Sequence, residues 1–421
     1  YCHKTEILMT ATQTTPTQTT ATQTTATQTT AAAAPAPVPR SKNASVLRSA
    51  EDVTCAHVDR VADAIAETIV HEVVRNDPDA RAGVEVSLDA YRASITGFIA
   101  AANYADRLQA PGGPLLSFTN EDLATLVQAQ LSAAGYVEQW ALQLPLESTL
   151  MVDTLQPDEL SNRDFSDDQS IVVGFATPVQ SHGWMPIEVV AARSAQQALH
   201  RCALSNPDSL GPDGKVLIGV RQQGGTSVVE FVNVSVQHNE LTSFGRLHEL
   251  VVPTVLNALS LIAGLEIPER FSPSWFVVNG RGGFNEGGPK GDNGLSGKKL
   301  VVDHYGPRIP IGGGALAGKD SKKADKAGAL AARKLAVSIA AASGTEVMVT
   351  LAWFPGASEP QMAQAELSDG RVLDRSQIEA LIGPVNLSLS AIVQDLQLQS
   401  VCWPQLVRTG YFGCNSLWDQ P

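Results

Sequence analysis

Two glycine-rich stretches, each ending in lysines, constrain the fold of this chain most. The first, GPKGDNGLSGKK, spans residues 288–299, and the second, GGGALAGKDSKK, spans residues 312–323. Glycine recurs at every third position of the first stretch, as in collagen, but the period ends at Lys299, whereas collagen needs it over long proline-rich runs. Because glycine lets a backbone approach a ligand closely, both stretches predict binding loops with lysines at their edges.

The second stretch fits a phosphate-binding P-loop only in part. Gly313 to Lys319 satisfies the pattern G-x-x-x-x-G-K, but Asp320 stands where a P-loop has the Ser or Thr that holds Mg²⁺. The preceding segment, 307–311, is broken by prolines and is not a short hydrophobic strand. A P-loop nucleotidase is therefore disfavoured. A surface turn beside a solvated helix start would explain one such cluster, but two lysine-flanked clusters favour an anion-binding site.

Charge and composition narrow the class of partner. The chain has 421 residues, 43% of them hydrophobic, enough for a buried core and two or three domains. Thirty Lys and Arg against 43 Asp and Glu give a net charge of -13, which argues against a nucleic acid or an anionic membrane as the main partner. Five scattered cysteines without a Cys-x-x-Cys pair indicate neither a disulfide framework nor a zinc site and favour the cytoplasm. No apolar run approaches the roughly 18 residues of a membrane span.

The N-terminal segment differs from the rest of the chain. Residues 11–30 repeat a threonine-rich pentapeptide and lead into AAAAPAPVPR. Such a sequence cannot bury enough apolar surface to offset the entropy lost on ordering. It lacks the apolar core of a secretory signal, and because its first arginine is Arg40 it does not resemble a transit peptide. Residues 1–45 are therefore predicted to be a disordered tail.

Hydrophobic periodicity predicts a mixture of helices and strands. Apolar residues at steps of three and four predict a helix over 56–76, and alternation predicts a β-hairpin whose second arm is 228–238. Helices are also expected at 247–265 and 323–342, and strands at 169–177, 215–221, 299–305 and 346–354. The elements follow no βαβ rhythm, so an α+β fold of several layers is expected in place of a doubly wound sheet.

The two loops resemble the paired signature loops of S-adenosylmethionine synthetases, the methionine adenosyltransferases. The matching stretches are GGPKGDNGLSGKKLVVDHYG and GGGALAGKDSKKADKAGALAAR, and the likeness runs from about Ser49 to the C-terminal TGYFGCNSLWD. The resemblance implies an α+β fold of three similar subdomains about a pseudo-threefold axis, expected here at 46–160, 161–283 and 284–421. Without the resemblance, the alternative is a two-domain α+β kinase-like protein.

The family's reaction explains the residue types. Methionine sulfur attacks C5′ of ATP, and the whole triphosphate leaves and is hydrolysed to pyrophosphate and phosphate. Stabilising that charge takes cations and Mg²⁺, not a nucleophilic side chain. The resemblance implies ATP and L-methionine as substrates, Mg²⁺ (two per site) and K⁺ as cofactors, and a homodimer or homotetramer with its sites between subunits. A hetero-oligomer with another synthetase is a further alternative.

The resemblance also implies site residues. Taken alone, His57 and Asp59 would be interpreted as a helix cap, and Lys215 or Glu85 as solvated side chains. The occurrence of all these residues in the family's order favours the family. The catalytic residues would be His57, acting on the oxygen that leaves C5′, and Lys215, Lys299 and Lys319, acting on the triphosphate. The triphosphate would also be bound by Lys298 and Lys323, Mg²⁺ by Asp59 and Asp325, and K⁺ by Glu85. Glu51 would face the nucleotide, Asp168 would contact the nucleoside, and Asp292 and Phe98 would lie at the substrate.

Several departures from the family bear on function. Cys55, Ala56, Val58 and Arg60 replace residues of the family's Glu-Gly-His-Pro-Asp-Lys start, and Phe98 stands where the family has a glutamate that receives the methionine ammonium group. Losing such a hydrogen bond costs about 1.5–3 kcal/mol, or about 10–150-fold. The segment 165–170 lacks three glycines of the family, and Lys298 replaces an arginine and gives up its bidentate fork. The family's flexible active-site loop is expected at 145–165.

Three readings follow from this mixture. The chain is a working but divergent synthetase, an enzyme that alkylates a different sulfur nucleophile, or a non-catalytic paralogue that pairs with an active subunit. The retained lysines favour catalysis, since a subunit freed from catalysis has no physical reason to crowd like charges into two glycine loops.

Overall fold

The computed structural model describes residues 45–102, 118–269 and 274–421, and residues 43–421 form one compact unit. Almost all of the predicted tail, 1–45, lies outside the described residues. Among the helices of the described ranges, none combines the length and the apolar character that crossing a bilayer requires.

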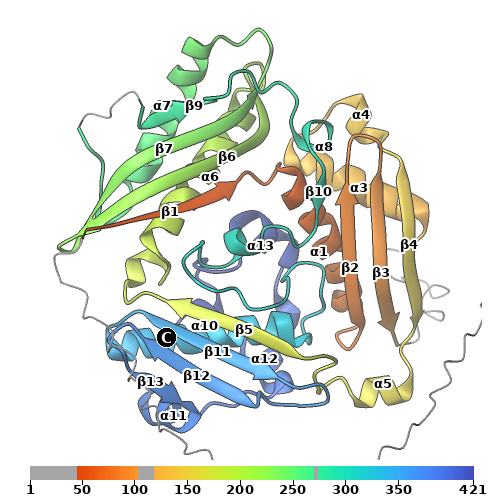
Figure 1. The fold of residues 1–421 in the computed structure, drawn as a ribbon. Coiled ribbons are helices and arrows are strands. Elements are labelled where there is room, and N and C mark those ends of the chain that lie inside the picture. Colours follow the sequence, from red (N-terminus) through yellow and green to blue (C-terminus); the bar gives the residue numbers. More distant parts are fainter. Residues whose placement is uncertain (1–44, 103–117, 270–273) are drawn as a thin grey trace, which may run out of the picture. The chain divides into compact units, whose positions relative to one another are not determined.

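Three sheets build the compact unit (Figure 1). The first contains β1 (Val46–Val53), β6 (Leu210–Gln223), β7 (Thr226–His238), β8 (Leu265–Glu266) and β9 (Phe276–Val278). The second contains β10 (Gly294–Leu295), β2 (Arg81–Leu88), β3 (Ala93–Ala101) and β4 (Leu146–Thr154). The third contains β13 (Val372–Asp374), β12 (Met362–Leu367), β11 (Val347–Trp353) and β5 (Ser170–Ala176). The predicted α+β class, with its three sheet-based layers, is confirmed.

The sheets exchange strands between distant parts of the sequence. The early strand β1 pairs with β6, β5 pairs with β11, and β10 pairs with β2, all antiparallel. Each sheet thus takes one strand from a segment that belongs mainly to another layer, so the three layers are interlocked along the chain. The predicted boundaries at 160 and 283 stay predictions.

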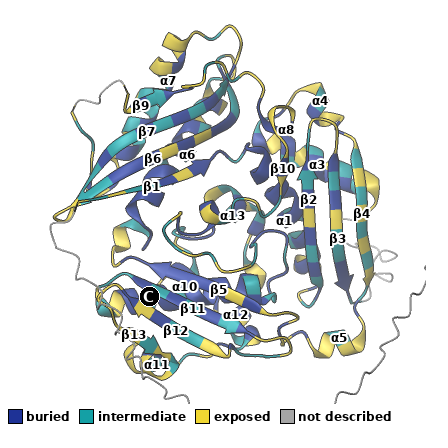
Figure 2. Ribbon diagram, in the orientation of Figure 1, coloured by how far each residue is buried: buried dark blue, intermediate teal, exposed yellow. Residues whose placement is uncertain are grey.

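Helices cover one face of each sheet. α6 (Ile187–Ser205) and α7 (Phe244–Ser260) pack on the first sheet, and α1 (Val58–Asn76) and α3 (Asn120–Ala134) on the second. α10 (Ala324–Ser343) and α11 (Arg375–Ile382) pack on the third sheet, and α12 (Leu389–Asp395) packs on α10. The short helices are α4 (Gln139–Leu142), α5 (Pro157–Ser161), α8 (Gly288–Gly291), α9 (Leu300–Asp303) and α13 (Trp403–Thr409), the last packed on α1. Figure 2 shows that α1 and α10 are among the most buried elements.

Small residues let α10 lie close to its sheet. Its buried side is largely alanine, and a Cβ on Gly174 of β5 would collide with the backbone of Ala332. On α1, the apolar residues that predicted the helix are all buried, as are Val232, Val234 and Val236 of β7. The predictions of α1, the β6–β7 hairpin, β5, α10 and β11 are confirmed.

Three predictions of local structure were wrong. Residues 299–305 form no strand: Leu300–Asp303 is the short helix α9, where the buried Asp303 binds Arg60 of α1. The helix predicted to reach residue 265 ends at Ser260, and Leu265–Glu266 pairs with β7. The expected flexible loop at 145–165 contains β4, parallel to β3, and α5. In the first case a buried ion pair outweighed the β-branched sequence.

Candidate active site

The first glycine-rich loop lies across the N-terminus of α1. Gly294 has no room for a side chain, because a Cβ there would lie 2.6 Å from the backbone carbon of Val58. The carboxylate of Asp59 accepts the N–H of Leu295 at 3.0 Å, and that of Asp63 accepts the N–H of Gly297 at 2.7 Å. The triplet spacing of glycines therefore belongs to a loop fitted onto a helix.

His57 caps α1 and is neutral at neutral pH. Its Nδ1 accepts the N–H of Asp59 at 3.2 Å. Burial, and then the charges of Lys215 and Lys299, lower the pKa of His57 to about 3. Because Nδ1 is an acceptor in the neutral ring, the proton sits on Nε2. His57 can therefore donate a hydrogen bond to an anionic oxygen without first being protonated.

Asp59 is buried and ionised, and its carboxylate lies close to two lysines. Burial acts to raise its pKa, but hydrogen bonds from Lys299 and the Leu295 N–H outweigh burial and lower it. Lys299 forms an ion pair with Oδ2, and Lys298 Nζ lies 3.8 Å from Oδ1. An ionised carboxylate is the kind of ligand that suits Mg²⁺, which proteins often bind with one or two carboxylates plus substrate phosphates.

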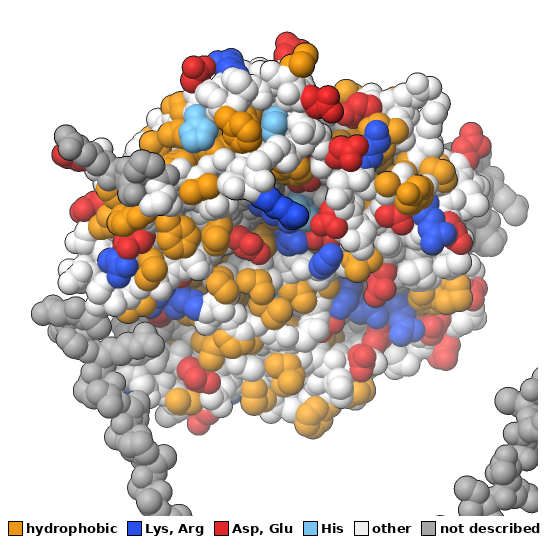
Figure 3. All heavy atoms as spheres, turned by 45° about the horizontal axis from the view of Figure 1, so that its top comes forward, with side chains coloured by type: hydrophobic (Ala, Val, Ile, Leu, Met, Phe, Trp, Pro, Cys, Tyr) orange, Lys and Arg blue, Asp and Glu red, His pale blue; other side chains and the backbone are white. Residues whose placement is uncertain are grey.

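Lys215 and Asp213 of β6 extend this group. Lys215 is exposed, and its charge acts on both His57 and Asp213. Asp213 accepts the N–H of Gly288 at 2.8 Å. Burial raises the pKa of Asp213 to about 6, and the charge of the nearby Asp292 adds to this rise, whereas the Gly288 N–H and the charge of Lys215 oppose it. Glu51 is exposed on β1, opposite Leu217. We call His57, Asp59, Lys215, Lys298 and Lys299 the α1 cluster. Figure 3 shows Lys and Arg beside acidic side chains on one face of the molecule.

The second glycine-rich loop is anchored between α1 and β2. Gly318 has φ +75°, and a Cβ there would collide with the carbonyl oxygen of Val84. Its N–H donates to Glu67 at 2.6 Å, and its carbonyl accepts the Val84 N–H at 2.8 Å. Next to it, Lys319 Nζ lies 2.5 Å from Asp325 Oδ2, while Asp325 Oδ1 accepts the hydroxyl of Ser170 at 2.6 Å. The loop thus presents a second lysine–carboxylate pair.

A cleft of about 540 Å³ opens beside this second pair. We call it the second-loop cleft; its wall includes Glu85, Gly297, Gly314, Lys319 and Asp325. None of the α1 cluster is among its lining residues. Both loops contribute to this wall, Ser296 and Gly297 from the first and Gly318 and Lys319 from the second.

Lys323 forms an ion pair with Asp167, the residue before Asp168, whose predicted contact with the nucleoside stays a prediction. Its Nζ lies 2.5 Å from Asp167, which also accepts from Arg81 at 3.2 Å. Burial acts to raise the pKa of Asp167, but Lys323 and Arg81 lower it. Asp168 is exposed, and its carboxylate accepts the N–H of Gln169. The sequence offers two adjacent aspartates and no signal for choosing between them.

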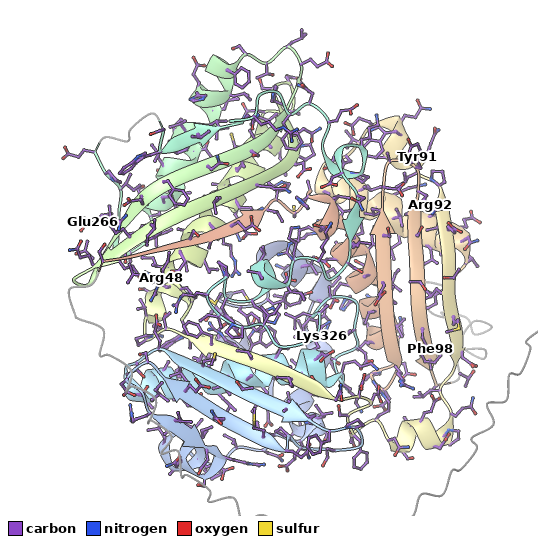
Figure 4. All side chains as sticks on the ribbon, viewed as in Figure 1. Arg48, Tyr91, Arg92, Phe98, Glu266 and Lys326 are labelled. Atoms are coloured by element: carbon purple, nitrogen blue, oxygen red, sulfur yellow. The ribbon has the colours of Figure 1, made fainter. Side chains whose placement is uncertain are left out.

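Phe98 lies on the face of the second sheet that carries Glu85. It pairs with Gly83 of β2 and Met151 of β4, and the guanidinium of Arg81 lies 5.9 Å from its ring centroid (Figure 4). A cation stands here beside an aromatic ring, at the position where the resemblance implies a carboxylate.

Sequence reasoning missed the buried polar residues behind the loops. Asp63, Glu67, Lys326 and Asp213 are buried, and each contacts a glycine-loop backbone group. A signal was present: Asp59, Asp63 and Glu67 recur at steps of four on one face of a helix whose other buried residues are largely apolar.

The buried Asp63 gives a testable pH dependence. Burial and the charge of Asp303 raise its pKa to about 8, against the opposing charge of Arg60. Since this folded-state pKa lies above the unfolded value of about 3.9, its contribution to stability is present at low pH and is lost as pH rises toward 8. Asp63→Asn mimics the protonated acid, so its thermal unfolding temperature relative to wild type should rise steadily from pH 5 to pH 8. The exposed Asp153→Asn should show no such trend, and a flat difference for Asp63→Asn would contradict a raised pKa.

Comparisons with known proteins place the chain in a family. Residues 164–283 match the family model of the S-adenosylmethionine synthetase central domain, and residues 286–420 match that of its C-terminal domain. The S-adenosylmethionine synthase of Methylobacterium radiotolerans is 31% identical over 394 residues, covering 89% of this chain and 94% of that protein. The synthase of Aquifex aeolicus is 28% identical over 386 residues, covering 89% and 96%.

A solved structure shares the fold. It is described as an unusual S-adenosylmethionine synthetase from Campylobacter jejuni, and it superposes with a TM-score of 0.76 at 23% identity, covering 89% of this chain and 97% of that one. The loops, the fold and these relatives lead to one conclusion: the chain is a divergent member of the S-adenosylmethionine synthetase family, the methionine adenosyltransferases.

Proposed function

We propose that this protein makes S-adenosylmethionine from ATP and L-methionine and hydrolyses the triphosphate to pyrophosphate and phosphate. The observation that carries the proposal is the pairing, in each glycine-rich loop, of a lysine with a carboxylate: Lys299 with Asp59, and Lys319 with Asp325. A polyphosphate bound at such pairs meets cationic side chains and carboxylates able to hold Mg²⁺.

The chain's residues act on the leaving group in this mechanism. The sulfur lone pair of methionine forms the new bond at C5′ as the C5′–O bond breaks, and both electrons of that bond leave with the triphosphate. His57 donates its Nε2–H to the leaving oxygen, and Lys215, Lys299, Lys319 and Lys323 stabilise the phosphate charge. His57 is held by the backbone N–H of Asp59, and Lys299, Lys319 and Lys323 are each held by a carboxylate. Groups placed before reaction meet the condition for electrostatic catalysis.

The proposed metal sites fit the donor set. Within the described residues, no three His, Cys, Asp or Glu side chains gather as a metal group. An ion here therefore needs substrate oxygens to complete its shell, as is usual for Mg²⁺. We assign Asp59 and Asp325 to Mg²⁺ and Glu85, in the wall of the second-loop cleft, to K⁺. Bound Mg²⁺ would neutralise charge on the triphosphate.

We place the protein in the cytoplasm, as its cysteine content favours, and infer that it acts as an assembly of subunits, because none of the α1 cluster lines the second-loop cleft. We propose that the α1 cluster of one copy and the second-loop cleft of another complete one site in a homodimer or homotetramer. A synthetase of another type could supply the same complement in a hetero-oligomer.

Mixing two inactive variants tests this arrangement. Lys299→Ala removes a cation from one group and Lys319→Ala from the other, so each homo-oligomer should be nearly inactive. Co-expression should restore activity to about a quarter of wild type, because half the dimers are mixed and one of their two sites is intact. No restoration would contradict a shared site. The control is co-expression of Lys299→Ala with Lys298→Ala. Both variants alter the α1 cluster, so every site of a mixed dimer keeps one altered lysine and activity should not be restored.

A different sulfur nucleophile is the second candidate function. It is favoured by Phe98 and its neighbour Arg81, which offer no carboxylate to a methionine ammonium group. Incubation with ATP, Mg²⁺, K⁺ and methionine, followed by assay of S-adenosylmethionine, pyrophosphate and phosphate, separates the alternatives. All three products support the proposed function, whereas triphosphate hydrolysis without adenosyl transfer supports the altered nucleophile. Inactivity alone, with a shift in activity on mixing with an ordinary synthetase, supports a non-catalytic paralogue.

A further inference from the structure

Three carboxylates on one face of α1 hold both glycine-rich loops. Asp59 accepts the N–H of Leu295, Asp63 that of Gly297 and Glu67 that of Gly318. Each also contacts a cation: Lys299, Arg60 and Lys326 respectively. At 1.5 Å per residue, the first and last of these carboxylates are about 12 Å apart along the helix. One helix thus sets the spacing between the two loops.

The third carboxylate–cation pair, Glu67 with Lys326, holds the backbone around Lys319. Glu67 and Lys326 form an ion pair whose side chains are 0% and 1% exposed. Glu67 accepts the N–H of Gly318 at 2.6 Å, and Lys326 Nζ donates to the carbonyl of Lys319 at 2.9 Å. The same Nζ lies 3.9 Å from the ring centroid of Trp403, which limits its movement. The backbone of the Gly318–Lys319 segment is therefore fixed at both ends by one buried pair.

Stability alone is a weak reason for such a pair. Removing two charges from water costs free energy that their attraction often fails to recover, and well-packed apolar residues frequently replace buried pairs without loss. Burial acts in this direction here, raising the pKa of Glu67 and lowering that of Lys326. The pair joins α1, packed on the second sheet, to α10, packed on the third (Figure 4 labels Lys326). Both members of the pair also bind the backbone of the second glycine-rich loop.

We propose that Glu67 and Lys326 are positioning residues for Lys319. They hold its backbone so that Nζ reaches Asp325 in the wall of the second-loop cleft. The catalytic consequence rests on the proposed function, because it takes Lys319 to bind the triphosphate. The positioning itself is a property of the chain and can be measured without turnover.

The main variant removes both charges together. In Glu67→Gln/Lys326→Met, Gln keeps an acceptor for Gly318 while Met cannot donate to Lys319. The double variant should unfold near the wild-type temperature, with kcat lowered about 10²-fold, the size of effect known for small misplacements at a reacting centre. KM for ATP and methionine should change much less. Wild-type kcat in the folded double variant would overturn the proposal.

A control and a second variant keep the test decisive. Asp419→Asn breaks another fully buried pair on α10, with Arg333, and touches neither loop, so it should lower the unfolding temperature and leave kcat unchanged. Glu67→Asp keeps the charge opposite Lys326 but draws the acceptor back from Gly318. If the double variant does not fold, the binding and exchange measurements on Glu67→Asp test the positioning role by themselves.

Two readouts separate this proposal from the proposed function. Titration calorimetry with magnesium tripolyphosphate should show at least tenfold weaker binding for Glu67→Asp than for wild type. Hydrogen–deuterium exchange of the intact protein should be faster at Gly318 and Lys319 in that variant. Unchanged binding and exchange would overturn the positioning role. A wild type that makes no S-adenosylmethionine would overturn the proposed function, while faster exchange in Glu67→Asp would still support positioning.

Discussion

Replacing Lys319 by alanine is expected to lower the rate of adenosyl transfer by about 10²–10³, the effect of losing one preorganised electrostatic partner. Its Nζ lies 2.5 Å from Asp325, its carbonyl accepts from Lys326, and the backbone of the preceding Gly318 is held by Glu67 and Val84. The position of the ammonium group is therefore set before charge develops on the leaving triphosphate. The measurement is steady-state formation of S-adenosylmethionine at saturating ATP and methionine, so that the loss is seen in kcat.

The adjacent Lys322 provides a matched control for this loss. Its Nζ lies 2.7 Å from Asp79 and 3.5 Å from Asp164, and it is not among the residues lining the second-loop cleft. Lys322→Ala removes the same charge from the same loop and should change kcat by less than about threefold, because Lys322 points at Asp79 and Asp164 and not into the cleft. Equal losses in both variants would show a general effect of loop charge, and an unchanged rate for Lys319→Ala would remove that lysine from the mechanism.

The parts of the fold that could be predicted are those in which a local pattern reports a local constraint. α1 was visible because its apolar period matches the face it buries. The glycine loops were visible because contacts dictate the glycines: Gly294 lies against the backbone of Val58, and Gly318 takes a positive φ against Val84. A side chain at either position would displace the loop, so the sequence must show glycine.

The parts that could not be predicted depend on partners far along the chain. Residues 300–303 look like a strand, yet form a helix because Asp303 meets Arg60 in the interior. Asp167, not Asp168, binds Lys323, and only the three-dimensional arrangement distinguishes them. The order of motifs along the sequence likewise says nothing about whether the loops share one cavity. In this chain residues of both loops line the second-loop cleft, Ser296 and Gly297 from the first and Gly318 and Lys319 from the second, whereas the α1 cluster does not.

Introducing the carboxylate that the family resemblance implies at position 98 should strengthen the binding of methionine. Phe98→Glu is expected to lower KM for methionine by about tenfold, because a charge-assisted hydrogen bond to an ammonium group contributes about 1.5–3 kcal/mol. The lower end of that range applies, since the new carboxylate would lie beside Arg81 and be partly neutralised. Arg81 itself already contacts Asp167 at 3.2 Å and Glu159 at 3.4 Å. Methionine titrations at saturating ATP measure the change.

Phe98→Gln separates charge from shape in this test, because it has the size of glutamate and no charge. A fall in KM for Glu but not Gln assigns the effect to the ammonium group and supports methionine as the substrate of a weakened site. Equal, unchanged KM values for both variants would place position 98 away from the acceptor. A rise in KM for both would mean that the aromatic ring itself binds the acceptor, as a nucleophile without an ammonium group requires. Thioethers lacking the amino group should then be better acceptors for wild type than for either variant, which makes the Phe98–Arg81 pair a determinant of the nucleophile that reaches ATP.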